Sequence, residues 1–119
     1  MSMVTVIIPS GGPAERFFTP TIRDVLAKAA GEVEVYAVTD GWVAPLEERV
    51  RDSRVTYLAL EPSLHNQKRQ AINLAAARCA GDYLMALDAH CMVAEGFDEL
   101  LSAAYEPGGL LVPRRLRLD

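Results

Sequence analysis

The stretch VTVIIPSGG, residues 4–12, decides the fold of this 119-residue chain. Five β-branched residues followed by proline, serine and two glycines are typical of a buried strand that runs into a turn. A helix is predicted next, with Thr19 as its N-cap, Pro20 in its first turn and Gly31 as its terminator. The apolar face of this helix carries Ile22, Val25, Leu26 and Ala29, at i, i+3, i+4 and i+7.

Strand and helix patterns continue to alternate along the rest of the chain. Strands are predicted over 33–38, 55–60 and 83–87, with a strand-like segment at 110–112. Helices are predicted over 45–51, over 64–80 with Leu64, Ala71, Ala75 and Cys79 on one face, and in a last segment with Phe97, Leu100, Leu101 and Ala104 on one face. This alternation predicts an α/β fold with a mainly parallel, Rossmann-like sheet, right-handed crossovers and flanking helices.

Composition favours one domain over residues 1–119, with 50% hydrophobic and 24% charged residues. The formal net charge of −4 argues against nucleic acid as a partner. No apolar run is long enough for a membrane span, and the N-terminus lacks the basic stretch of a signal peptide, so we expect a cytoplasmic protein. Cys79 and Cys91 have no CxxC spacing and are expected to be reduced thiols.

Small and polar residues follow the predicted strands. In open parallel sheets, ligands bind beyond the carboxyl ends of the strands. Those ends are Ser10-Gly11-Gly12, Thr39-Asp40-Gly41, Glu61 and Asp88-Ala89-His90. The sequence therefore predicts a cleft for a polar ligand, together with a metal ion.

Asp88 and His90 are the candidate metal ligands. Alternate residues of an extended segment project to the same side, so that one carboxylate and one imidazole can meet one ion. An oxygen and nitrogen pair with open positions suits Mn²⁺ or Mg²⁺, with water and a diphosphate completing the shell. The alternative interpretation is a strand-end turn in which Asp88 is a cap and His90 is a solvated neighbour.

Three further positions allow a functional and a structural interpretation. Lys68 lies near the start of a predicted helix, where its ammonium can reach a phosphate or, alternatively, cover apolar surface with its stem. Asp40 can present a carboxylate to a base N–H or a ribose hydroxyl, or belong to an ordinary Asp-Gly turn. Trp42 and Tyr36 are expected to be packing residues, and Cys91 is expected to be a buried thiol rather than a third ligand.

Two parts of the chain together resemble the inverting family 2 glycosyltransferases. Val6-Ile7-Ile8-Pro9-Ser10 with Glu15 resembles the family's first strand, Pro-Thr/Ser turn and following acidic residue. The stretch from Lys68 to Asp88 is similar, without a gap, to the family's Gly-Lys-x-x-Ala-Leu-Asn helix, Gly-Asp/Glu-Tyr turn and Leu-Asp-x-Asp metal motif. Asp88-Ala89-His90-Cys91 also resembles the Asp-Ser-His-Cys variant of polypeptide N-acetylgalactosaminyltransferases.

This resemblance implies a GT-A type domain that binds a nucleotide-diphosphate sugar, with a UDP-linked donor favoured, and transfers the sugar to an unknown acceptor. The implied metal ligands are Asp88 and His90, for Mn²⁺ or Mg²⁺, which would neutralise charge on the leaving diphosphate. The implied nucleotide-binding residues are Pro9, Ser10, Glu15, Asp40, Lys68, Asp88 and Ala89.

Several features leave alternatives open. Gly11-Gly12 replaces the family's Tyr-Asn, and Gln67 replaces the glycine before Lys68, so the identity of the base is undecided. The sequence after His90 is short, and Asp98 and Glu99 are poorly placed to act as the general base.

We therefore expect a truncated or minimal domain that lacks most of the acceptor-binding half. A partner chain or a homo-oligomer would complete it, or it would bind a nucleotide sugar without catalysing transfer. The segment from Gly11 to Thr21 also resembles the phosphate loop of sugar nucleotidyltransferases, which is the rival enzymatic interpretation.

Overall fold

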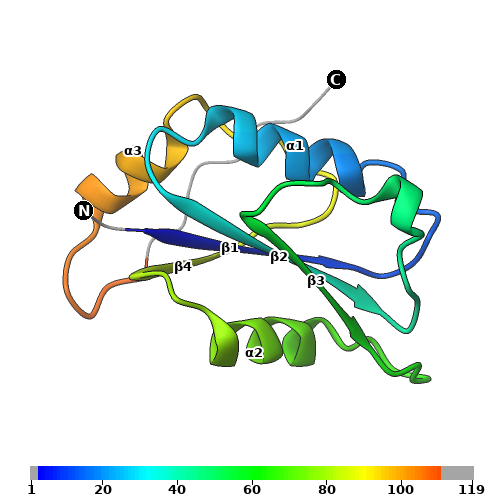
Figure 1. The fold of residues 1–119 in the computed structure, drawn as a ribbon. Helices are drawn as coiled ribbons and strands as arrows, with labels where there is room; N and C mark the ends of the chain where they lie inside the picture. Colours follow the sequence, from blue (N-terminus) through cyan, green and yellow to red (C-terminus); the bar gives the residue numbers. More distant parts are fainter. Residues whose placement is uncertain (1–2, 111–119) are drawn as a thin grey trace.

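The computed structural model describes residues 3–110, which form a four-stranded parallel sheet between helices (Figure 1). The strands are β1 (Val4–Ser10), β2 (Val33–Asp40), β3 (Val55–Leu60) and β4 (Tyr83–Ala86). The helices are α1 (Phe18–Lys28), α2 (Lys68–Arg78) and α3 (Phe97–Ala104), with a short 3₁₀ turn, η1 (Leu46–Glu48). The predicted α/β class is confirmed. Within the described residues, no helix is long and apolar enough to cross a membrane.

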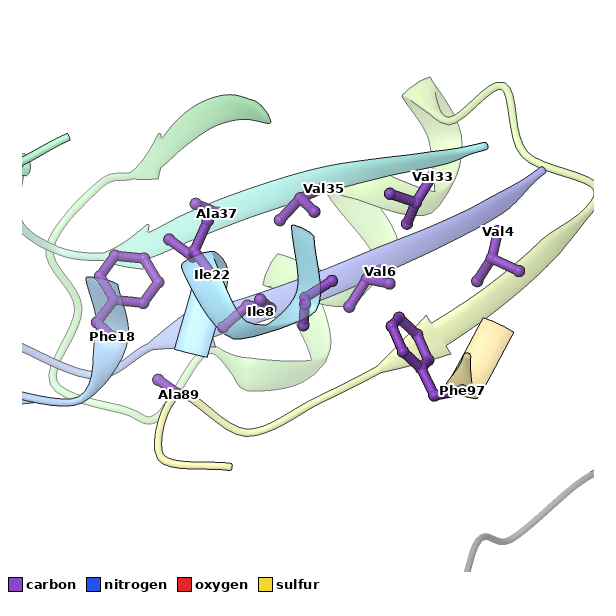
Figure 2. Close-up of a cluster of buried hydrophobic side chains, with 11 residues drawn as sticks. Val4, Val6, Ile8, Phe18, Ile22, Val33, Val35, Ala37, Ala89 and Phe97 are labelled. Atoms are coloured by element: carbon purple, nitrogen blue, oxygen red, sulfur yellow. The ribbon is translucent and has the colours of Figure 1, made fainter. Parts of the chain in front are cut away.

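Both faces of the sheet are covered. Helices α1 and α3 lie on one face and α2 lies on the other (Figure 1). Because side chains alternate along a strand, Val6 and Ile8 of β1 belong to the core under α1, whereas Ile7 belongs to the core under α2. Figure 2 shows the larger core, with Phe18 and Ala89 at one end and Phe97 at the other.

Strand β1 is paired along both edges. Val4 lies opposite Val33 of β2 and also opposite Tyr83 of β4, and the strand order is β3-β2-β1-β4. The chain thus runs outward from β1 through β2 to β3 and then returns to the other side of β1. In sheets of this kind, the point where the order reverses is where a crevice forms outside the carboxyl ends of the strands.

The second main helix is shorter than the sequence pattern predicts. The expected helix over 64–80 begins only at Lys68, and Leu64 is fully exposed in the preceding loop. Local side chains cause this difference, because Ser63 accepts the backbone N–H of His65 and Asn66 accepts that of Lys68. The expected helical face is present further along, where Ala71 and Ala75 are completely buried.

Three other expectations are corrected at the ends of elements. Helix α1 begins at Phe18, and Thr19 is not its N-cap, because the Thr19 hydroxyl donates to the carbonyl of Glu48. The helix expected over 45–51 is reduced to η1, with Leu46 exposed. Leu100 of α3 is likewise exposed, although Phe97 is buried as predicted.

The remaining strand and packing expectations have mixed outcomes. Strand β4 ends at Ala86, but the backbone N–H of Leu87 still donates to Ile7. Of the strand-like segment at 110–112, Leu110 is not in a strand and the other two positions lie outside the described residues. Trp42 and Tyr36 are packing residues as predicted, with the Trp42 ring in an edge contact with Phe18. Both cysteines are free thiols.

Gly81 lies against the backbone of β1 at the turn before β4. Its N–H donates to the Thr5 hydroxyl at 3.1 Å, and that hydroxyl donates to Glu34, which also accepts the N–H of Ala80. A Cβ atom at Gly81 would lie 2.2 Å from the Thr5 hydroxyl oxygen and 2.8 Å from the Thr5 nitrogen. Only glycine fits this approach without moving β1.

We therefore predict that Gly81→Ala lowers the free energy of unfolding by about 2–3 kcal/mol, the upper range for overpacking a tight site. Urea unfolding followed by circular dichroism measures this change. The matched control is Gly11→Ala, where a Cβ atom meets nothing within 4 Å, and a change within about 0.5 kcal/mol is expected. Equal unfolding midpoints for Gly81→Ala and the parent would contradict the close approach.

Asp98 ties α3 to the turn between α1 and β2. Its two carboxylate oxygens accept the backbone N–H groups of Ala30 and Gly31, each at 2.8 Å, and the residue is buried. Burial alone would raise the pKa of this carboxyl, but the N–H donors, with others in its own helix turn, outweigh burial and hold the pKa below its usual value. The ionised form of Asp98 is therefore the one that stabilises the fold.

We predict that Asp98→Asn lowers the free energy of unfolding at pH 7 by about 1–3 kcal/mol, as expected for lost hydrogen bonds to a charged group. Because the pKa is depressed in the folded state, this contribution is present above the unfolded pKa and is lost as the pH falls through the folded pKa. Urea unfolding at neutral and acidic pH should show the gap between variant and parent closing at low pH. A difference in the free energy of unfolding that stays constant with pH would contradict this role. So would a difference no larger than that caused by Glu99→Gln on the same helix.

Candidate functional site

The candidate site lies at the carboxyl edge of the sheet. Ser10 ends β1, Asp40 ends β2, and Asp88 follows β4 after Leu87, whose N–H bond to Ile7 prolongs the β1–β4 pairing. Because the strands are parallel, these three ends share one edge of the sheet. The polar residues that the sequence places after strands therefore gather there.

Asp40 is held by the residue that precedes α2. The backbone N–H of Gln67 donates to Asp40 Oδ2 at 3.1 Å, and the Gln67 side-chain amide donates to Asp40 Oδ1 at 2.8 Å. The same Gln67 nitrogen donates to the carbonyl of Glu61 at 2.7 Å. The end of β2, the loop after β3 and the start of α2 thus meet at one carboxylate.

Lys68, the first residue of α2, reaches across to the end of β4. Its Nζ lies 2.5 Å from Asp88 Oδ1, and the side chains are 53% and 30% exposed. Together with the contact of Gln67 to Asp40, this ion pair brings Asp40, Lys68 and Asp88 around the N-terminus of one helix. A fixed acceptor, a cation and a second carboxylate therefore line the same edge.

Pro9 and Ser10 shape the loop that follows β1. Pro9 is the last but one residue of the strand, opposite Val38, and Ser10 is buried. The Ser10 hydroxyl donates to the carbonyl of Gly12, and the Ser10 carbonyl accepts the Trp42 indole N–H at 3.2 Å. Their contact with a nucleotide stays a prediction.

Glu15 lines a separate hollow on the α1 side of the sheet. This hollow has a volume of about 350 Å³, and its walls include Phe18, Trp42 and Tyr57. Glu15 Oε2 is buried and has no hydrogen-bond partner among the described residues. Within residues 3–110, no hydrogen bond or ion pair joins Glu15 to the residues around α2. The role of Glu15 in nucleotide binding therefore stays a prediction.

The loop after Asp88 is anchored by its next residue and by α1. Ala89 is buried in the larger core, His90 is exposed, and Cys91 is half-buried. Further on, the N–H of Val93 donates to the carboxylate of Asp24 on α1 at 2.7 Å. This anchoring fixes the loop that carries both predicted metal ligands.

The donor chemistry of Asp88 and His90, a carboxylate and an imidazole, suits a borderline divalent ion such as Mn²⁺, whereas Mg²⁺ prefers oxygen ligands and would use chiefly the carboxylate. Over residues 3–110, however, no group of three or more His, Cys, Asp or Glu side chains is placed to hold a metal. At most two protein ligands are therefore available from this loop, and the remaining positions would fall to water and substrate oxygens.

The link between Gln67 and Asp40 was not predicted from the sequence. Gln67 stands where the resembled family has glycine, and no local pattern indicates a contact between positions 27 residues apart. The available signal was indirect: an acidic residue that ends one strand and an amide side chain immediately before a helix belong to the same expected edge of the sheet.

Residues 5–117 match the model of a family described as glycosyl transferase family 2. None of the curated proteins compared with the chain gives a significant match. Members of the matched family commonly use a divalent metal.

The ion pair between Lys68 and Asp88 should contribute little to folding, since both side chains are partly exposed to water. We predict a coupling energy of at most about 1 kcal/mol in a double-mutant cycle of Lys68→Met and Asp88→Asn, measured by urea unfolding. The pair between Lys28 and Asp24 gives a matched reference within one helix. A coupling above about 2 kcal/mol would show instead that Lys68 and Asp88 mainly hold the fold together.

Proposed function

Since the chain belongs to glycosyl transferase family 2, we propose that this edge of the sheet binds a nucleotide-diphosphate sugar and supports transfer of the sugar to an acceptor. The observation that supports the proposal is the grouping of Asp40, Lys68 and Asp88 around the start of α2. Each of these residues suits a different part of such a donor. A UDP-linked sugar is the favoured donor.

Asp40 would bind the base or the ribose. Its carboxylate accepts hydrogen bonds and offers none, so it suits a base N–H or a ribose hydroxyl. The two contacts from Gln67 fix its direction before a ligand arrives. Pro9, Ser10 and Ala89 are proposed to shape the surrounding surface, and Glu15 is proposed to contact the nucleotide from the loop between β1 and α1.

Lys68 would bind the diphosphate. A lysine ammonium is a compact charge that suits phosphate oxygens, and its position in the first turn of α2 adds the positive end of the helix dipole. In the structure this ammonium forms an ion pair with Asp88. Lys68 would exchange that carboxylate for the diphosphate when the donor and a cation are bound.

Asp88 and His90 would hold the cation, Mn²⁺ or Mg²⁺. When bound, the ion supplies positive charge beside the departing diphosphate, which lowers the barrier to breaking the glycosidic phosphate ester bond. Lys68 would stabilise the same developing charge with its ammonium group. Ala89, buried between the two ligands, keeps their backbone in place.

Transfer also requires a base for the proton of the acceptor hydroxyl as its oxygen attacks the anomeric carbon. Asp98 does not supply this base, because its carboxylate is buried against the backbone of Ala30 and Gly31. Those residues precede β2, so Asp98 lies at the edge opposite the site. The base and the acceptor surface are proposed to come from a partner chain, a second copy of this chain or a further part of the same protein.

Calorimetric titration with UDP, GDP and CDP, each with Mn²⁺, tests this function. We predict that one nucleotide binds, that excess chelator abolishes the binding, and that His90→Ala lowers the metal-supported affinity about tenfold or more. The matched control is His65→Ala, the other histidine of the chain, which is exposed in the loop before α2.

Binding of none of the three nucleotides by the folded parent would contradict the proposal. Equal metal-supported affinities for His90→Ala and the parent would contradict the role of His90 alone. A product assay with the bound nucleotide's sugar derivatives then separates transfer from binding without catalysis.

A further inference from the structure

Gln67 makes two hydrogen bonds to the end of β2 and one to the residue that follows β3. Its backbone N–H and its side-chain amide each bind one oxygen of Asp40, at 3.1 and 2.8 Å. The second hydrogen of the amide binds the carbonyl of Glu61 at 2.7 Å. Both hydrogens of the amide are thus used, so that the side chain cannot rotate without losing a contact.

The backbone next to Asp40 is equally constrained. Gly41 has a φ of +78° and donates its N–H to the carbonyl of Leu60 at 3.1 Å. A Cβ atom at Gly41 would lie 3.2 Å from the Cα of Pro62. The turn therefore packs directly on the loop that leads to Gln67, and Asp40 is fixed at both its backbone and its carboxylate.

The Asp40 carboxylate can still accept hydrogen bonds from a ligand. An ionised carboxylate has about four acceptor sites, and Gln67 occupies one on each oxygen. The remaining sites accept hydrogen bonds and offer none. A base edge with an N–H group, such as the N3 of uracil or the N1 and N2 of guanine, can therefore bind. Cytosine instead places the lone pair of its N3 against the carboxylate, and its N4 amino group can donate only if the base or the carboxylate shifts.

We propose that Gln67 is a positioning residue that fixes the Asp40 carboxylate toward the base, and that discrimination against cytosine therefore depends on Gln67. This inference rests on the nucleotide binding proposed above. A free Asp40 side chain can turn away from an unfavourable base edge, while a clamped one cannot. The amide of Gln67 thus restricts the Asp40 carboxylate to one orientation, in which it selects among bases.

The test compares Gln67→Met with the parent. Methionine has nearly the same length but no amide, so the backbone contact to Asp40 remains and the two amide contacts are lost. The matched control is Gln70→Met, the same substitution at an exposed position of α2. Affinities for UDP, GDP and CDP are measured with Mn²⁺, and inorganic pyrophosphate with Mn²⁺ reports on the diphosphate region without a base.

We expect the ratio of CDP to UDP or GDP dissociation constants to fall about tenfold in Gln67→Met, with pyrophosphate affinity unchanged. Gln70→Met should retain the parent ratio.

An unchanged ratio in Gln67→Met would overturn the inference. A loss of pyrophosphate affinity as large as the loss of nucleotide affinity would also overturn it, because it would indicate a merely structural role for Gln67. If the folded parent binds pyrophosphate but shows no preference among nucleotides, the inference fails while the diphosphate site stands. If it binds neither, the proposed function fails with it.

Discussion

The pairing of β1 along both its edges is the constraint on which the structure depends. A strand with neighbours on both sides and helices on both faces must be apolar on both faces, and Val6, Ile7 and Ile8 are completely or almost completely buried. Because β2 and β4 flank the same strand, the chain must reverse direction across the sheet at β1. That reversal brings the ends of β1, β2 and β4 together and creates the edge at which Asp40 and Asp88 lie.

The approach of Gly81 to Thr5 is a direct consequence of this arrangement. The turn before β4 must bring the chain against the beginning of β1, and only a residue without a Cβ atom allows the contact. The network from Thr5 through Glu34 to Ala80 then joins β1, β2 and the start of β4 by side-chain hydrogen bonds. A few polar contacts therefore fix the register that the apolar faces alone leave open.

Most of the fold follows from local patterns in the sequence. The β-branched run at 4–8 and the alternation of strands and helices predict the parallel sheet, because periodicity reports which side of an element is buried. The ends of the helices were predicted less well, since they depend on competing hydrogen bonds. Asn66 delays the start of α2, and Thr19 bonds to Glu48 instead of capping α1, a contact that spans 29 residues.

At the site, too, some features follow from the sequence and others do not. The positions of Asp40 and Asp88 at one edge follow from the order of the strands, and the ion pair with Lys68 places that residue beside them. The contact between Gln67 and Asp40 depends on how the loop after β3 returns to the sheet, which no local pattern encodes. The family was recognisable from the register between Lys68 and Asp88, but a register does not indicate which side chains bind each other.

The two sides of the site differ in how they are supported. Asp40 ends β2, which is paired on both edges and is buried along most of its length, whereas Asp88 follows β4, a strand of four residues at the edge of the described sheet. Local opening of an edge strand exposes less apolar surface than opening of a central one, so its free energy is lower. Fluctuations that release Asp88 are therefore less costly than fluctuations that displace Asp40. A ligand that contacts both sides restricts those motions, and part of its binding free energy is spent on ordering β4.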